Sequence, residues 1–71
     1  DYIFVCDGFN GLKVFDISDI SNVTEVNHLE GFTSRDVILR DGRMYIIATD
    51  QLLKYDYTDL QNIRLLNSLD L

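Results

Sequence analysis

The chain has little of what a disulfide framework, a metal centre or a usual catalytic site requires. Among its 71 residues there are one cysteine, Cys6, one histidine, His28, and no tryptophan or proline. A single cysteine cannot form an intrachain disulfide, and a single histidine cannot build a histidine-rich metal site. No phosphate-binding loop, dinucleotide fingerprint, hydrolase elbow or CxxC pair occurs. We therefore predict no catalytic residue, no metal ligand and no cofactor within these residues.

Basic residues are also scarce. Six Lys and Arg side chains stand against twelve Asp and Glu side chains, which gives a net charge of −6 and an isoelectric point near 4.3. Binding to nucleic acid or to anionic membranes depends on attraction between Lys or Arg and phosphate. No apolar run approaches the roughly 18–20 residues of a transmembrane helix. We expect neither a nucleic-acid partner nor membrane insertion.

The hydrophobic content is nevertheless ordinary for a globular protein, at 46% of residues. A chain this short buries only about 60% of the surface that its unfolded form exposes, so it is marginal as an independent domain. A hydrophobic run, Tyr2–Cys6, begins directly after Asp1. These features predict a piece of a longer protein, a mature product or a module that assembles with others.

The sequence contains an internal repeat. Residues 2–7 match residues 45–50 at an offset of 43, and residues 11–29 match residues 51–69 at an offset of 40. Nine of these 25 aligned pairs are identical, and residues 8–10 have no counterpart in the second unit. Repeats of about 40–45 residues with four strands each are typical of β-propeller blades.

Each unit contains short runs of apolar and β-forming residues, separated by Gly, Asp, Asn and Ser, which indicates strands. Asp41-Gly42 predicts a type I′ hairpin turn, because this turn needs positive φ at both central residues. A helix is the alternative over residues 60–71, where apolar residues recur every three positions, but the match with residues 20–31 favours a strand. The predicted strands are 2–6, 12–17, 23–29, 36–40, 44–49, 52–57 and 63–69.

The predicted fold is all-β, with antiparallel four-stranded blades of a β-propeller. Residues 1–29 supply a partial blade of three strands that lacks the first, and residues 30–71 supply a complete blade. The continuous apolar runs 2–6 and 44–49 predict strands covered on both faces. Because an isolated blade leaves both faces exposed, we expect neighbouring blades or further copies of the chain as partners.

The segment Leu12-Lys13-Val14-Phe15-Asp16, followed by Ile17-Ser18-Asp19 and preceded by the glycine-rich loop Asp7–Gly11, resembles the LVIVD repeat family. Residues 52–59 look like a degenerate second copy. Lys13 and Lys54 replace apolar positions of the family pattern. The resemblance implies a β-propeller of bacterial and archaeal surface or exported proteins, and hence an extracellular, periplasmic or cell-surface location. It implies no shared catalytic residues.

Two acidic turns repeat, at residues 16–22 and 56–62. Their oxygen atoms are suitable ligands for Ca²⁺, but the spacing lacks the central glycine and bidentate glutamate of an EF-hand loop. Asp, Ser and Asn side chains also hydrogen-bond nearby backbone groups in tight turns. We interpret both segments as turn-building, with a metal site as the alternative.

Three further residues are candidates for chemistry or binding. Cys6 and His28 are conceivable as nucleophile and base, but no third group to orient them is identifiable, and Cys6 is interpreted as a small buried hydrophobe. Phe9 and Asn10 lie in the loop that only the first unit has, and extra loops often carry function. Phe9 is either an exposed contact for a partner or packed against the neighbouring blade.

Together these patterns predict a non-enzymatic propeller segment, a surface scaffold that presents loops to a protein or a polysaccharide. One alternative is an enzyme or ligand-binding propeller whose central-channel site is completed by blades outside this chain. Another is a self-associating propeller fragment, in which an exposed strand pairs with another copy.

Overall fold

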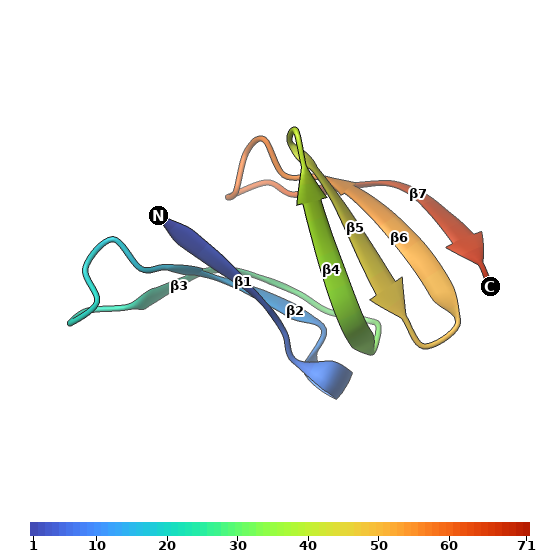
Figure 1. Cartoon of the computed structure of the whole chain (residues 1–71), viewed down its shortest axis with the longest axis horizontal. Helices are drawn as coiled ribbons and strands as arrows, with labels where there is room; N and C mark the ends of the chain where they lie inside the picture. Colours follow the sequence, from blue (N-terminus) through green and yellow to red (C-terminus); the bar gives the residue numbers. More distant parts are fainter.

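The computed structural model describes all residues, 1–71, and consists of two antiparallel sheets placed side by side (Figure 1). Each sheet is an up-and-down arrangement in which consecutive strands are hydrogen-bonded neighbours. The predicted all-β class with blade-like antiparallel sheets is confirmed. The first sheet contains β1 (Tyr2–Cys6), β2 (Leu12–Asp16) and β3 (Thr24–Leu29), and the second contains β4 (Ser34–Arg40), β5 (Arg43–Ala48), β6 (Gln51–Asp56) and β7 (Arg64–Asp70).

The only helical element is a single 3₁₀ turn, η1 (Gly8–Asn10), between β1 and β2. No helix has the length and apolar character needed to span a bilayer. The helical alternative for residues 60–71 is wrong, because β7 occupies most of this segment and pairs with β6 on both sides of one irregularity. Leu69 of β7 lies opposite Leu52 of β6.

The β4–β5 hairpin has the turn that its sequence predicts. Asp41 and Gly42 have φ values of 49° and 77°, and Arg40 pairs with Arg43 on either side of them. Asp41 is the only non-glycine residue with positive φ. The turn fits the right-handed twist of the flanking strands, and Gly42 adopts its φ without steric cost.

Both sheets contain a β-bulge at the same place in the repeat. Val26 is the extra residue in β3, and Leu66 is its counterpart in β7. Beside each bulge an asparagine side chain, Asn27 or Asn67, accepts a hydrogen bond from the backbone N–H of the following residue at 2.8 Å. The two units therefore share an irregularity as well as a strand pattern.

The core lies between one face of each sheet. Side chains of alternate residues point to the same face of a strand, and the alternate residues Leu12 and Val14 of β2 are fully buried. They pack with the inner face of the second sheet, in which Met44 and Ile46 are also fully buried. The remaining core residues are Ala48, Leu53 and Tyr55.

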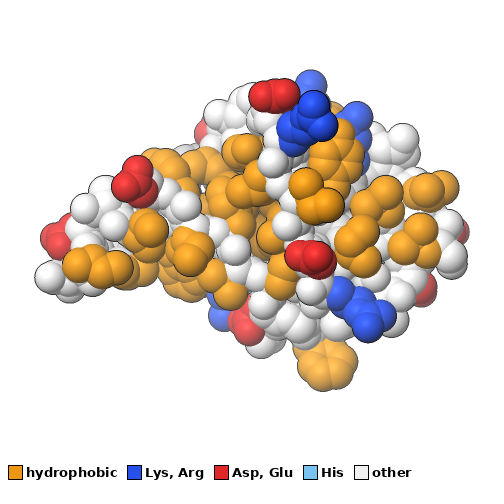
Figure 2. Space-filling view, in the orientation of Figure 1, with side chains coloured by type: hydrophobic (Ala, Val, Ile, Leu, Met, Phe, Trp, Pro, Cys, Tyr) orange, Lys and Arg blue, Asp and Glu red, His pale blue; other side chains and the backbone are white.

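The opposite faces of the two sheets are not covered. In β1 no residue is buried, and in β5 burial alternates between buried and half-buried positions. Within this chain each of these two strands is covered on one face only, and cover of the second face by a neighbouring unit stays a prediction. The physical reason is that a stack of two sheets has only one interface, so each sheet buries one face. Figure 2 shows hydrophobic side chains at the surface of both sheets.

Candidate functional site

The loop between β1 and β2 is closed by three backbone hydrogen bonds. Asp7 N–H donates to the Gly11 carbonyl at 2.9 Å, Asn10 N–H donates to the Asp7 carbonyl at 2.9 Å, and Gly11 N–H donates to the Gly8 carbonyl at 3.1 Å. Phe9 lies at the centre of the η1 turn, and 92% of its surface is exposed. The loop therefore holds an aromatic side chain in solvent on a defined backbone.

Gly11 fixes the end of this loop against both sheets. Its φ is 76°, and a Cβ atom at this position would lie 2.0 Å from the backbone oxygen of Leu29. Its own carbonyl accepts a hydrogen bond from the buried Ser34 hydroxyl at 2.6 Å. Because Ser34 begins β4, the loop is connected to the second sheet as well as to the first.

The side chains of Lys13 and His28 hold the loop at Asp7 and at Asn10. Lys13 Nζ lies 2.9 Å from Asp7 Oδ2. The hydrogen bond from Lys13 lowers the pKa of Asp7, and the same bond raises the pKa of Lys13. His28 Nε2 donates to the Asn10 carbonyl, while His28 Nδ1 lies 3.5 Å from Glu30 Oε1. His28 thus holds the loop backbone.

Phe9 was interpreted either as an exposed partner contact or as packed against the neighbouring blade. Its ring is not packed against the neighbouring sheet of this chain but stands free in solvent. Asn10 is exposed beside it. A partner contact by Phe9 and Asn10 stays a prediction.

Cys6 and His28 cannot act as a nucleophile and base pair. Cys6 lies opposite Leu12, and His28 lies opposite Lys13, the next residue along β2. Consecutive residues of a strand point to opposite faces, so the two side chains lie on opposite sides of the sheet. Cys6 is half-buried and packs against the core, as its interpretation as a small hydrophobe requires.

The two acidic turns have the same hydrogen bonds. Asp16 Oδ1 accepts from the Ser18 backbone at 2.9 Å and from the Ser18 hydroxyl at 2.6 Å. Asp56 Oδ1 accepts the same pair from Thr58 at 2.9 and 2.7 Å. The turn-building interpretation is therefore confirmed. No group of three or more His, Cys, Asp or Glu side chains is gathered closely enough to hold a metal ion.

The Asp56 carboxylate is the most strongly perturbed acid of the chain. The backbone hydrogen bond from Thr58 is the largest cause that lowers its pKa to about 2, and the Thr58 hydroxyl is the next. Arg64 and Arg43 lie 3.3 and 3.6 Å from Asp56 Oδ2 and act in the same direction. The hydrogen bonds from Ser18 lower the pKa of Asp16 in the same way.

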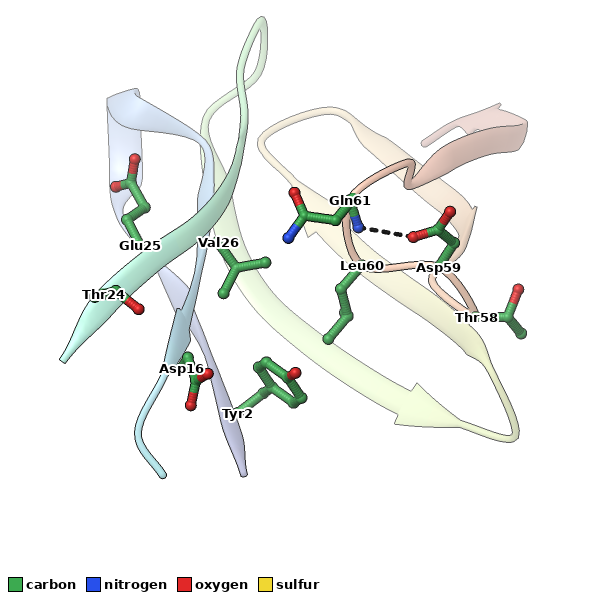
Figure 3. Close-up of a pocket in the computed structure, with 9 residues that line it drawn as sticks. All are labelled: Tyr2, Asp16, Thr24, Glu25, Val26, Thr58, Asp59, Leu60 and Gln61. Carbon is green, nitrogen blue, oxygen red and sulfur yellow. Dashed lines mark hydrogen bonds between the residues drawn. The ribbon is translucent and has the colours of Figure 1, made fainter. Parts of the chain in front are cut away.

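A groove of about 600 Å³ opens between the sheets beside the second acidic turn (Figure 3). Val26 of the first sheet and Leu60 of the turn extend into it from opposite sides. Asn27 Nδ2 donates to the Leu60 carbonyl at 3.0 Å across this junction. Nearby, the Phe4 and Tyr57 rings meet edge-on with centroids 5.3 Å apart.

Sequence reasoning did not identify Asn27 as a contact between the sheets. A signal was present, because asparagine occupies this position in both units, at Asn27 and Asn67. The same identity is explained by the local bond at the bulge, however, so the pattern alone does not reveal the contact with Leu60.

The comparisons with known proteins agree with the strand pattern of the first unit. The family model of the LVIVD repeat matches residues 1–30. This range comprises β1, the η1 loop, β2 and β3. No curated protein and no solved structure matches the chain. Residues 1–30 thus match the LVIVD repeat and fold as a three-stranded antiparallel sheet of the blade type.

Proposed function

We propose that this chain is a non-enzymatic propeller segment that serves as a binding scaffold at the cell surface, in the periplasm or outside the cell. Its contact point is the loop of Phe9 and Asn10, which binds a protein or a polysaccharide. The observation that carries the proposal is the almost complete exposure of Phe9 on a loop whose backbone is fixed at both ends.

Two physical arguments support this role. Aromatic side chains are enriched among residues that dominate binding energy, because they offer large apolar area with few rotatable bonds. A contact loop that is already ordered loses little conformational entropy on binding. Gly11 and Ser34 provide that order through close packing and a buried hydrogen bond. A single exposed aromatic ring on a rigid turn is suited to contact with another flat apolar surface.

Immobilised cell-surface polysaccharides and a cell-envelope protein fraction provide the two arms of a binding test. We expect the parent chain to bind in one arm, and we expect Phe9→Ala to weaken that binding by about tenfold or more. Leu71→Ala is the matched control, because Leu71 is also an exposed hydrophobic residue but lies outside the loop. Equal binding by Phe9→Ala, or no binding in either arm, would contradict the proposal.

Self-association is the second candidate, and it is favoured by the uncovered sheet faces. Ile3 on β1, Ile38 on β4 and Leu69 on β7 are all exposed. Apolar residues gathered on an uncovered face mark an interaction surface more often than single scattered ones do. We propose that further units of the same kind cover these faces.

A further inference from the structure

A groove lies on the uncovered face of the second sheet. It is formed by strands β5, β6 and β7, and its lining combines apolar side chains with one amide and one ammonium group. Leu69 at its edge is 59% exposed. The lining residues are Tyr45, Leu52, Lys54, Asn67, Ser68 and Leu69.

The internal repeat gives this groove a counterpart that the second unit partly covers. Each lining residue has an aligned partner in the first sheet, and two of those partners, Leu12 and Val14, are fully buried beneath the second sheet. The first unit therefore shows what covers this face when another unit is present. The aligned residues are Tyr2, Leu12, Val14, Asn27, His28 and Leu29.

At this partly covered counterpart, the acidic turn of the second unit makes contacts with the first sheet. The Leu60 carbonyl accepts the hydrogen bond from Asn27, and Leu60 and Ile63 pack against the core. The aligned residues of the first acidic turn are Ile20 and Val23, which are 78% and 45% exposed. The groove on the second sheet therefore has no turn packed on it, and the 17–22 turn has no sheet face to pack on.

We propose that the groove binds the 17–22 turn of a second copy of this chain. Asn67 Nδ2 then donates to the Ile20 carbonyl of that copy, as Asn27 donates to Leu60 within the chain. The contact continues the established interface between the sheets and repeats its geometry. It rests on the proposal that further units cover the exposed faces, and it names which surfaces meet.

The charges of the two surfaces are complementary. The groove contains Lys54 and no acidic side chain, whereas the turn carries Asp19 beside Ile20. Because the groove and the turn are different surfaces, the association is head-to-tail. Such a contact forms a ring when its rotation closes and an open chain of copies when it does not.

Sedimentation velocity over a range of concentrations tests this proposal with two charge-introducing variants. Leu69→Glu blocks the groove and leaves the turn intact, whereas Ile20→Glu blocks the turn and leaves the groove intact. Both residues are exposed, so each variant retains the fold, which circular dichroism checks. We expect the parent chain to associate with increasing concentration and each variant alone to remain monomeric.

An equimolar mixture of the two variants is the decisive sample. It retains one intact groove and one intact turn on different molecules, so we expect one-to-one dimers and nothing larger. Leu71→Glu is the control and is expected to associate as the parent chain does. Parent chain that is monomeric up to about 1 mM, the weak end of specific association, overturns the proposal. Variants that still associate, or a mixture that stays monomeric, also overturn it.

Phe9→Ala keeps this test separate from that of the scaffold role. Phe9 lies outside both the groove and the 17–22 turn, so this variant is expected to sediment as the parent chain does. A parent chain that stays monomeric but binds through Phe9 rejects only the head-to-tail contact. A parent chain that associates through the groove but shows no Phe9-dependent binding rejects only the role of the Phe9 loop.

Discussion

The side-chain amide of Asn27 donates a hydrogen bond to the backbone carbonyl of Leu60, 33 positions away and in the other unit of the repeat. Asn27 also accepts a bond from the next backbone N–H, which stabilises the bulge in β3. Asn67 makes the same local bond in β7. One residue type thus stabilises the bulge in both units and joins the two sheets at Asn27.

Replacement of Asn27 by alanine should lower the free energy of unfolding by about 1–2 kcal/mol more than replacement of Asn67 by alanine. Both variants lose the bond at the bulge, but only Asn27→Ala leaves the Leu60 carbonyl without its partner at the junction. Urea unfolding at low protein concentration, where copies do not associate, measures the difference. Equal losses in the two variants would show that the bond between the sheets contributes nothing.

Core packing predicts an asymmetry between aligned leucines. Leu12 is fully buried between the sheets, whereas its counterpart Leu52 is half-buried on the outer face. Leu12→Ala creates a cavity and should cost about 2–5 kcal/mol. Leu52→Ala should cost distinctly less, because water already reaches that side chain. Thermal unfolding followed by circular dichroism compares them, and a larger loss for Leu52→Ala would contradict the packing.

Two glycines of the Phe9 loop should respond differently to alanine. Both have positive φ, but a Cβ at Gly8 meets nothing within 4 Å, whereas a Cβ at Gly11 meets the Leu29 backbone at 2.0 Å. Gly8→Ala should cost about 1–2 kcal/mol from backbone strain alone. Gly11→Ala should cost about 1–3 kcal/mol more, because the backbone of Leu29 or of the loop must move to make room for the Cβ atom. Chemical denaturation ranks the two, and equal costs would argue against the close approach.

Acid should weaken the fold through Asp56. Its pKa is about 2 in the folded chain against an ordinary 3.8, so the unfolded chain binds more protons between these values. The stabilisation is therefore complete above the ordinary value and is lost as the pH falls through the folded value. Asp56→Asn should flatten this part of the pH profile, and Asp16→Asn should act in the same sense. If the free energy of unfolding of both variants fell with pH as steeply as that of the parent chain, these carboxylates would not be the cause of the acid sensitivity.

Local chemistry made much of this fold predictable. Asp41-Gly42 specifies its turn because few residues adopt positive φ twice in succession, and Asp16 and Asp56 specify theirs through bonds to residues two positions later. The seven strands follow from short apolar runs separated by turn residues. Because the same strand pattern recurs after about 40 residues, the sequence also predicted that the strands form propeller blades.

Interactions between residues distant in sequence could not be predicted as well from the sequence. Leu12 and Leu52 are identical in the alignment, yet only the first is buried, because burial depends on which face another sheet covers. The backbone of the Phe9 loop is likewise held by residues distant in sequence, Ser34 of β4 through Gly11 and His28 of β3 through Asn10. Neither the bulges nor the bond from Asn27 to Leu60 can be derived from strand periodicity.

The central claim is that the two repeat units pack face to face in one molecule. A nuclear Overhauser spectrum of dilute parent chain tests it most directly, through the Phe4 and Tyr57 rings, which belong to different units and meet edge-on. We expect cross-peaks between the ring protons of these two residues, and we expect the cross-peaks to be lost in Leu12→Ala if that variant unfolds. A spectrum with contacts within each sheet and none between the two rings would contradict the account.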